Sequence, residues 1–191
     1  GNWYTYARTR TKVAKSGAGE AFSSMGSNVR VGFDTIWNEN EFKIPVSKDN
    51  GVFTGTNSGD NRATWYDRLY SAGASGSTPL LGALRRAGES FKDTSATGPW
   101  GPETGDNQLS CRQNFAILTT DGYWNSTSGY DTKVGDADGT AGPTITDPKG
   151  ATWTYAVANP YKDNLETCGK KGCTAGGTVA DTLADVALAY W

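Results

Sequence analysis

Histidine is absent from this 191-residue sequence. Its absence excludes a Ser-His-Asp or Cys-His catalytic centre and a His-ligated zinc site. It also removes the side chain that most often acts as a general base near neutral pH. We therefore expect a protein that is not an enzyme.

Long runs of charged or apolar residues are absent as well. Lys and Arg total 18 against 20 for Asp and Glu, which gives a net charge of -2, and the basic residues form no run. We therefore expect no nucleic-acid partner. No apolar stretch approaches the roughly 20 residues of a membrane helix, so we expect no membrane span. The first residues show neither a signal-peptide pattern nor an initiator methionine, and we expect a piece of a longer precursor.

Glycine and aromatic residues, by contrast, are plentiful. The sequence has 25 Gly, seven Trp and nine Tyr, whereas hydrophobic residues make up only 36%. This composition indicates a modest core that carries long polar loops. Trp and Tyr at this density favour a core built on a few large side chains, although they are also typical of a carbohydrate-binding face.

The three cysteines are Cys111, Cys168 and Cys173. Cys168 and Cys173 bracket a Gly-Lys-Lys-Gly loop that is flexible enough to close on a disulfide. Three cysteines at this spacing match no common zinc pattern, so we favour the disulfide over a Cys-only metal site. A disulfide implies an oxidising compartment. Cys111 is then free or pairs outside this chain.

Apolar residues at three- and four-residue spacing predict helices at about residues 5–25, 62–72, 79–91 and 179–191. Gly17 and Gly19 weaken the first helix by roughly 1 kcal/mol each relative to Ala, so packing must hold it. At the start of the third helix, Thr78 suits the N-cap and Pro79 suits the first helical position.

Alternating apolar residues predict a strand over residues 29–36. Short strands are expected at 41–47 and 51–56, joined by a turn at Asn50-Gly51. The compact apolar run Phe115–Thr120 is typical of a strand that is buried on both faces. These strands alternate with helices, and the sequence therefore predicts an α/β sandwich with a mostly parallel sheet.

The whole chain, residues 1–191, is expected to form a single domain. Residues 122–171 are rich in Gly, Asp and Thr and predict an irregular insertion with a short strand at 152–157. Within it, Asp136-Ala137-Asp138-Gly139 resembles part of a calcium loop. The full EF-hand spacing is absent, so we favour a solvated turn over a calcium site.

Two short motifs lie where an α/β sheet places a ligand, just past the carboxyl ends of strands. The first is Gly76–Leu80 and the second is Thr119–Gly122. The Thr78 hydroxyl and the Asp121 carboxylate are hard oxygen donors that suit Mg²⁺ or Ca²⁺. The alternatives remain that Thr78 only caps a helix and that Asp121 only forms a turn before glycine.

This pairing resembles the second and third loops of the metal-ion-dependent adhesion site of von Willebrand factor A domains. Longer strings around it are similar to PilY-type proteins, bacterial pilus-tip adhesins: they are Asn2–Arg10, Gly76–Leu80, Cys111–Asn125 and Thr182–Trp191. The resemblance spans nearly the whole chain. It implies a Rossmann-like von Willebrand factor A sandwich, with Thr78 and Asp121 as ligands of Mg²⁺ or Ca²⁺.

The sequence departs from the family at one point, because no Asp-x-Ser-x-Ser loop occurs in it. In the family this loop follows the first, central strand, which precedes the first helix. We therefore expect an N-terminally incomplete domain that binds metal weakly. A strand from elsewhere is expected to fill the gap between residues 29–36 and 115–120.

The resemblance also implies a function. It is adhesion and assembly at the tip of a type IV pilus, after export to the cell surface or outer membrane of a Gram-negative bacterium. The implied partners are minor pilins or other pilus components and a host or surface ligand. Two alternatives stay open: a carbohydrate-binding or carbohydrate-active domain, and a purely structural von Willebrand fold without a working metal site.

Overall fold

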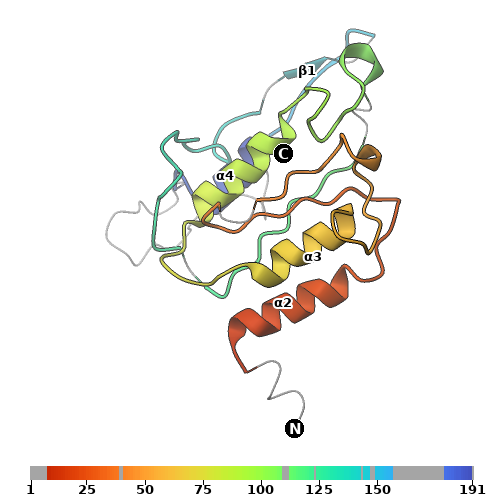
Figure 1. Cartoon of the computed structure of the whole chain (residues 1–191). Helices are drawn as coiled ribbons and strands as arrows, with labels where there is room; N and C mark the ends of the chain where they lie inside the picture. Colours follow the sequence, from red (N-terminus) through yellow and green to blue (C-terminus); the bar gives the residue numbers. More distant parts are fainter. Residues whose placement is uncertain are drawn as a thin grey trace. The chain divides into compact units, whose positions relative to one another are not determined.

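The computed structural model describes residues 8–38, 41–108, 112–122, 124–142, 144–146, 149–156 and 179–190. The elements are α2 (Arg10–Ala21), the 3-10 turn η1 (Asp49–Gly51), α3 (Asn61–Ser71), α4 (Leu80–Phe91), the 3-10 turn η2 (Gly105–Asn107), β1 (Thr144–Thr146), β2 (Thr152–Thr154) and α5 (Leu183–Ala189) (Figure 1). Within these ranges, every helix is too short or too polar to cross a membrane. The chain divides into two compact units, Gly1–Pro79 with Glu89–Ser126, and Leu80–Gly88 with Thr127–Trp191.

The four predicted helices are confirmed as α2, α3, α4 and α5, with ends that differ by up to five residues. Thr9 caps α2, since its hydroxyl accepts a hydrogen bond from the Lys12 N–H at 3.2 Å. The predicted cap of α4 is wrong. Pro79 itself occupies the N-cap position, and Thr78 lies outside the helix, where its backbone N–H and carbonyl bond to Asn125.

The core of the first unit is aromatic. Phe53, Trp65 and Leu69 are buried there. The Trp65 ring stacks on Phe22 with 4.6 Å between centroids, and it meets Phe53 edge-on at 5.5 Å. Its indole N–H donates to the Gly32 carbonyl at 3.1 Å, so the polar end of the ring is satisfied. The expectation of a core built on a few large side chains is therefore confirmed for this unit.

Helices α2 and α3 lie side by side (Figure 1). Gly19 lies at this contact, where a Cβ would overlap the hydroxyl at the end of the half-exposed Tyr70 side chain. The Tyr66 hydroxyl donates to the Gly19 carbonyl at 2.8 Å. Lys15 adds hydrogen bonds from its Nζ to the carbonyls of Tyr70 and Ala72, at the end of α3. Packing thus holds a helix that its glycines weaken, as the sequence predicts.

The predicted turn at Asn50-Gly51 is present, with both residues in the left-handed region, at φ 52° and 75°. The hairpin expected around this turn is absent from the described residues. Segments 41–47 and 51–56 each bridge the 29–36 segment in antiparallel fashion, through Phe33↔Phe42 and Arg30↔Val52. The aromatic core explains this choice, because Phe53 belongs to it and Phe33 and Phe42 pack against it.

The apolar run Phe115–Thr120 takes no regular secondary structure. Phe115 is 75% exposed and Ile117 is 74% exposed, so the prediction of burial on both faces is wrong for this chain. No backbone hydrogen bond joins residues 113–119 to any other described residue. The expected partner strand is not among the described elements, and the only sheet there is the antiparallel pair β1–β2. The parallel sheet, and with it the fold class, stays a prediction.

The second unit has its own small core, in which Leu81, Tyr130 and Val186 are buried. Tyr130 comes from the expected irregular insertion, so this part of the insertion helps to build a core. Gly88 of α4 packs against Tyr190, where a Cβ would overlap the ring. The short strand predicted at 152–157 is confirmed as β2 over its first three residues.

Candidate functional site

The loop before α4 holds Thr78 in a defined position. Gly76 has φ 86°, and a Cβ there would lie 3.2 Å from the ring of Trp37. The Trp37 indole N–H donates to the Ser77 carbonyl at 2.8 Å. The loop therefore needs glycine at its first position, both for its backbone conformation and for the close approach of the indole.

Thr78 is tied to the segment that follows Asp121. The Thr78 N–H donates to the Asn125 Oδ1 at 2.6 Å, and the Asn125 N–H donates to the Thr78 carbonyl at 3.3 Å. This pair of hydrogen bonds brings together the two segments that carry the predicted ligands. Shared ligation of a metal by Thr78 and Asp121 stays a prediction.

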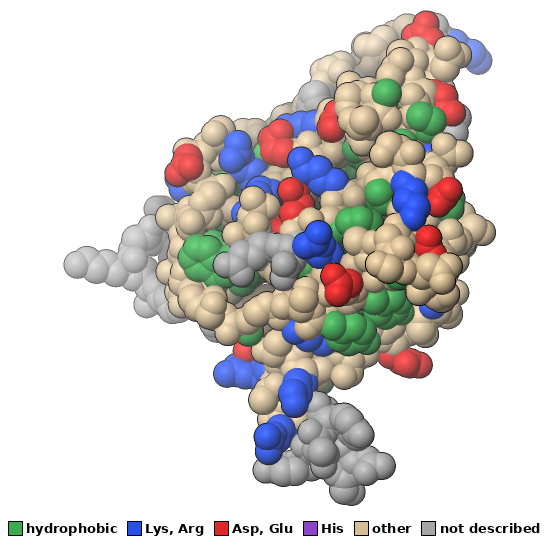
Figure 2. Space-filling model, in the orientation of Figure 1, with side chains coloured by type: hydrophobic (Ala, Val, Ile, Leu, Met, Phe, Trp, Pro, Cys, Tyr) green, Lys and Arg blue, Asp and Glu red, His purple; other side chains and the backbone are tan. Residues whose placement is uncertain are grey.

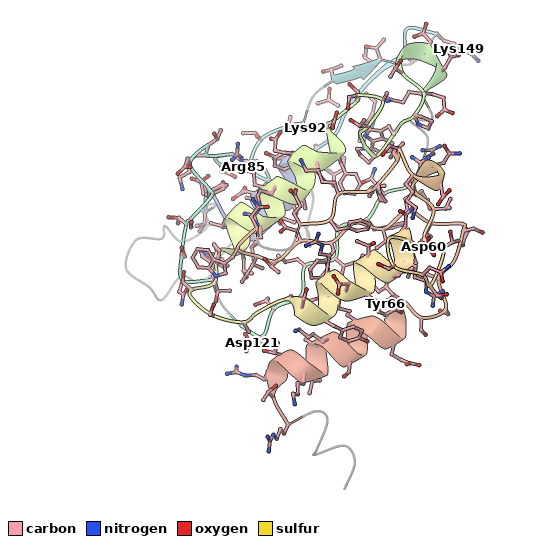
Figure 3. The ribbon with its side chains drawn as sticks, viewed as in Figure 1. Asp60, Tyr66, Arg85, Lys92, Asp121 and Lys149 are labelled. Carbon is pink, nitrogen blue, oxygen red and sulfur yellow. The ribbon has the colours of Figure 1, made fainter. Side chains whose placement is uncertain are left out.

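Asp121 lies at the surface, near the start of α2 (Figure 3). Its Oδ2 is 2.5 Å from the Nη1 of Arg10, and the two side chains are 58% and 84% exposed. An ion pair this exposed contributes at most about 1 kcal/mol, because water screens both charges. The Asp121 carboxylate is therefore reachable by a cation that competes with Arg10. The preceding Thr120 hydroxyl accepts the Gly122 N–H at 3.3 Å and so stabilises the turn.

A second group of oxygen ligands lies in the second unit. One carboxylate oxygen each from Asp136, Asp138 and Asp185 lies within 4.8 Å of the other two. Asp138 is 1% exposed and Asp185 is 0% exposed. The interpretation of Asp136–Gly139 as a solvated turn is therefore wrong for Asp138.

Asp185 was not predicted from the sequence as a metal ligand. Its signal was the Thr182-x-x-Asp185 pattern ahead of an apolar helix, which is a capping box. The Thr182 hydroxyl accepts the Asp185 N–H at 3.2 Å, and the Asp185 carboxylate accepts the Thr182 N–H at 2.8 Å. The same carboxylate also accepts the N–H groups of Ala137 and Asp138, at 2.8 and 3.2 Å.

Cys111, Cys168 and Cys173 lie outside the described residues, so the predicted disulfide between Cys168 and Cys173 stays a prediction. Charge is mixed on the face in Figure 2, where Lys and Arg side chains are interspersed with Asp and Glu.

Comparison with known proteins places the whole chain beside one bacterial factor. The chain is 33% identical over 197 aligned residues to the type IV pilus biogenesis factor PilY1 of Pseudomonas aeruginosa strain PAO1. It is 31% identical to PilY1 of strains PAK and UCBPP-PA14. The chain spans about 15% of the length of these relatives. No family model and no solved structure matches it.

The PilY-type resemblance carried by the sequence motifs is confirmed by these relatives, whereas the von Willebrand factor A domain stays a prediction. The alignments cover 100% of the chain for strains PAO1 and PAK. The chain is therefore related, along its full length, to a segment of the type IV pilus biogenesis factor PilY1.

Proposed function

We propose that this chain is an adhesion and assembly module of a type IV pilus tip protein. The observation that carries the proposal is its 33% identity to PilY1 over the whole chain, because PilY1 is named a type IV pilus biogenesis factor. In this proposal the protein is exported to the pilus tip, cell surface or outer membrane of a Gram-negative bacterium. Its partners are minor pilins or other pilus components, and a host or surface ligand.

The proposed ligand face surrounds Thr78 and Asp121, which share a Mg²⁺ or Ca²⁺ ion in a von Willebrand factor A sandwich. The hydrogen bonds between Thr78 and Asn125 support this proposal, since they join the two ligand-bearing segments. The exposure of the Asp121 carboxylate also supports it. The Asp-x-Ser-x-Ser ligands of such a site do not occur in this sequence.

The test compares two variants that remove the same ion pair. Asp121→Ala removes the proposed metal ligand, and Arg10→Ala removes only the exposed partner of that ligand. In a bacterium that carries the protein, Asp121→Ala should reduce attachment to surfaces, measured as adherent cells, and Arg10→Ala should not. Equal attachment of the two variants would show that Asp121 has no role beyond its ion pair.

Binding of metal is tested on the purified protein with the same pair. A cation that binds only the folded state stabilises it by about 2.7 kcal/mol at 100 times its dissociation constant. Mg²⁺ should raise the melting temperature of Arg10→Ala as much as that of the wild type. The rise should be smaller in Asp121→Ala, and the difference between the two variants is the contribution of this site. An identical rise in both variants would leave Asp121 as a turn residue.

A carbohydrate-binding role is a second candidate, and one observation favours it. Trp153 on β2 is 55% exposed, and its ring lies 5.6 Å from the ring of Tyr155. An exposed tryptophan ring of this kind can stack on the apolar face of a sugar. Trp153→Ala should abolish binding on a glycan array if this role holds, whereas a wild-type protein that retains no glycan would exclude it.

A further inference from the structure

Two arginines from distant parts of the sequence meet in the first unit. Arg30 lies in the 29–36 segment, and Arg112 lies just ahead of the Phe115–Thr120 run. The Nη1 atoms of both donate to the carbonyl oxygen of Gly101, at 2.7 Å from Arg30 and 3.2 Å from Arg112. Both arginines are half-buried. The structure therefore places two positive charges side by side and partly out of water.

The carbonyl that the two arginines share belongs to a folded loop after α4. Trp100 anchors this loop, because its indole N–H donates to the carbonyl of Phe91, the last residue of α4, at 2.6 Å. Gly101 itself is buried. Arg30 also donates from its Nη1 to the Pro99 carbonyl at 2.9 Å. The two guanidinium groups are therefore held in place by the loop, as a pre-organised binding site requires.

Most N–H donors of these two side chains remain available. A guanidinium has five N–H donors, and the hydrogen bonds that Arg30 and Arg112 make to the described residues all come from Nη1. Neither arginine has an ion-pair partner in the part of the chain that the structure describes. Glu103 attracts Arg30 electrostatically, but it is exposed and lies beyond ion-pair distance. The pair therefore keeps a net positive charge and free donors.

The pKa of Arg30 reflects this arrangement. Burial lowers the pKa below its ordinary value and the charge of Arg112 lowers it further, whereas the charge of Glu103 raises it. Like charges that meet away from water are unfavourable unless an opposite charge compensates them. The chain as a whole has a net charge of -2, so its overall field does not attract anions. An anion that binds here would be held by the two arginines.

We propose that Arg30 and Arg112 bind a doubly charged oxyanion, such as sulfate or a phosphate group. The planar fork of a guanidinium donates two parallel hydrogen bonds to the oxygens of such a group. Two forks side by side supply two positive charges, which match a dianion better than a single carboxylate. The site uses neither Thr78 nor Asp121, so it goes beyond the function proposed above and does not depend on it.

The experiment is a calorimetric titration of the whole chain with sodium sulfate and, separately, with sodium acetate at the same ionic strength. The expected result is one sulfate per chain, bound at least tenfold more tightly than acetate. Arg112→Gln should weaken sulfate binding at least tenfold, because it removes one fork and only one described hydrogen bond. The matched control is Arg8→Gln, which makes the same charge change at an exposed position and should leave the affinity unchanged.

A second pair of titrations identifies the source of the anion. Inorganic phosphate and glycerol phosphate are compared at pH 8, where both are doubly charged. Tighter binding of inorganic phosphate would identify a free ion as the ligand. Tighter binding of glycerol phosphate would identify an esterified group on a larger molecule, and either result supports the site.

Absence of sulfate binding by the wild-type protein up to tens of millimolar would overturn the proposal. Equal affinities for sulfate and acetate would overturn the assignment of a dianion. An equal loss of affinity in Arg112→Gln and Arg8→Gln would also overturn the proposal, because it would show attraction by net charge alone. If Arg112→Gln does not fold by circular dichroism, Arg112→Lys replaces it, since lysine keeps the charge without the fork. An unchanged affinity for sulfate in Arg112→Lys would then contradict binding by two forks.

Discussion

The buried hydroxyl of Tyr130 links the insertion to the turn before α5, and its removal is a sharp test of the second unit. Tyr130 is 1% exposed. Its O–H donates to the Asp181 Oδ1 at 2.7 Å and accepts the Val134 N–H at 3.2 Å. Tyr130→Phe removes this one oxygen and keeps the ring packed against Leu81 and Val186.

The cost of this substitution can be estimated from the two hydrogen bonds. A hydrogen bond to a charged group contributes about 1.5–3 kcal/mol, and a neutral one about 0.5–1.5 kcal/mol. Asp181 keeps the Gly135 N–H as a donor and is partly exposed, so water offsets part of the loss. We expect Tyr130→Phe to lower the free energy of unfolding at pH 7 by about 2–3 kcal/mol.

The same hydrogen bond predicts a dependence on pH. Donation from Tyr130, followed by the Gly135 N–H, lowers the pKa of Asp181 below its ordinary value. A carboxylate whose pKa is lower in the folded state stabilises the protein above its unfolded pKa of about 3.9. That contribution is lost as the pH falls through the folded pKa. The difference between wild type and Tyr130→Phe should therefore shrink below about pH 4.

Urea unfolding of both proteins at pH 7, and again at lower pH, measures these differences. The control is Tyr70→Phe, because Tyr70 is 54% exposed and should change the free energy of unfolding by less than about 0.5 kcal/mol. A Tyr130→Phe variant as stable as Tyr70→Phe at pH 7 would refute the inferred hydrogen bonds. A penalty that stays constant down to low pH would show that Asp181 is not the charged partner.

Three further predictions concern the core, the cysteines and the uncovered apolar run. Trp65→Ala should lower the free energy of unfolding by about 3–5 kcal/mol because Trp65 is 3% exposed, whereas Trp153→Ala should cost under about 1 kcal/mol in the same urea titration. Mass mapping of the non-reduced protein should show a peptide linked through Cys168 and Cys173, and free thiols at both would contradict the disulfide. Backbone amides of residues 115–120 should exchange hydrogen rapidly in this chain and slowly in a longer chain that carries a pairing strand. Equal exchange rates in the two chains would contradict the expectation that a strand from elsewhere pairs with this segment.

Sequence patterns located the helices because each helix shows an apolar stripe of its own. The strands could not be placed in the same way, since their partners depend on contacts between distant parts of the chain. Segments 41–47 and 51–56 were predicted as two strands joined by a turn. Phe42 and Val52 instead both bridge the 29–36 segment, and the aromatic core decides that pairing. The Phe115–Thr120 run has the composition of an inner strand, but composition does not supply the neighbours that would cover it.

The candidate site residues likewise differ in whether a local sequence pattern reveals them. Thr78 and Asp121 were found because their short motifs resemble a known family. Asp185 was not, because it lies far along the sequence from Asp136 and its pattern signals only a helix cap. Its second role, accepting the loop N–H groups of Ala137 and Asp138, exists only once α5 has packed against the loop.

The glycine contact between α2 and α3 has a consequence for the order of folding. An isolated helix of 12 residues is marginal in water, and α2 carries two glycines that weaken it further. Its stability comes from docking on Tyr66 and Tyr70 of α3. Helix α2 should therefore form only as it docks on α3, and it should be the first helix of the first unit to open in native-state hydrogen exchange.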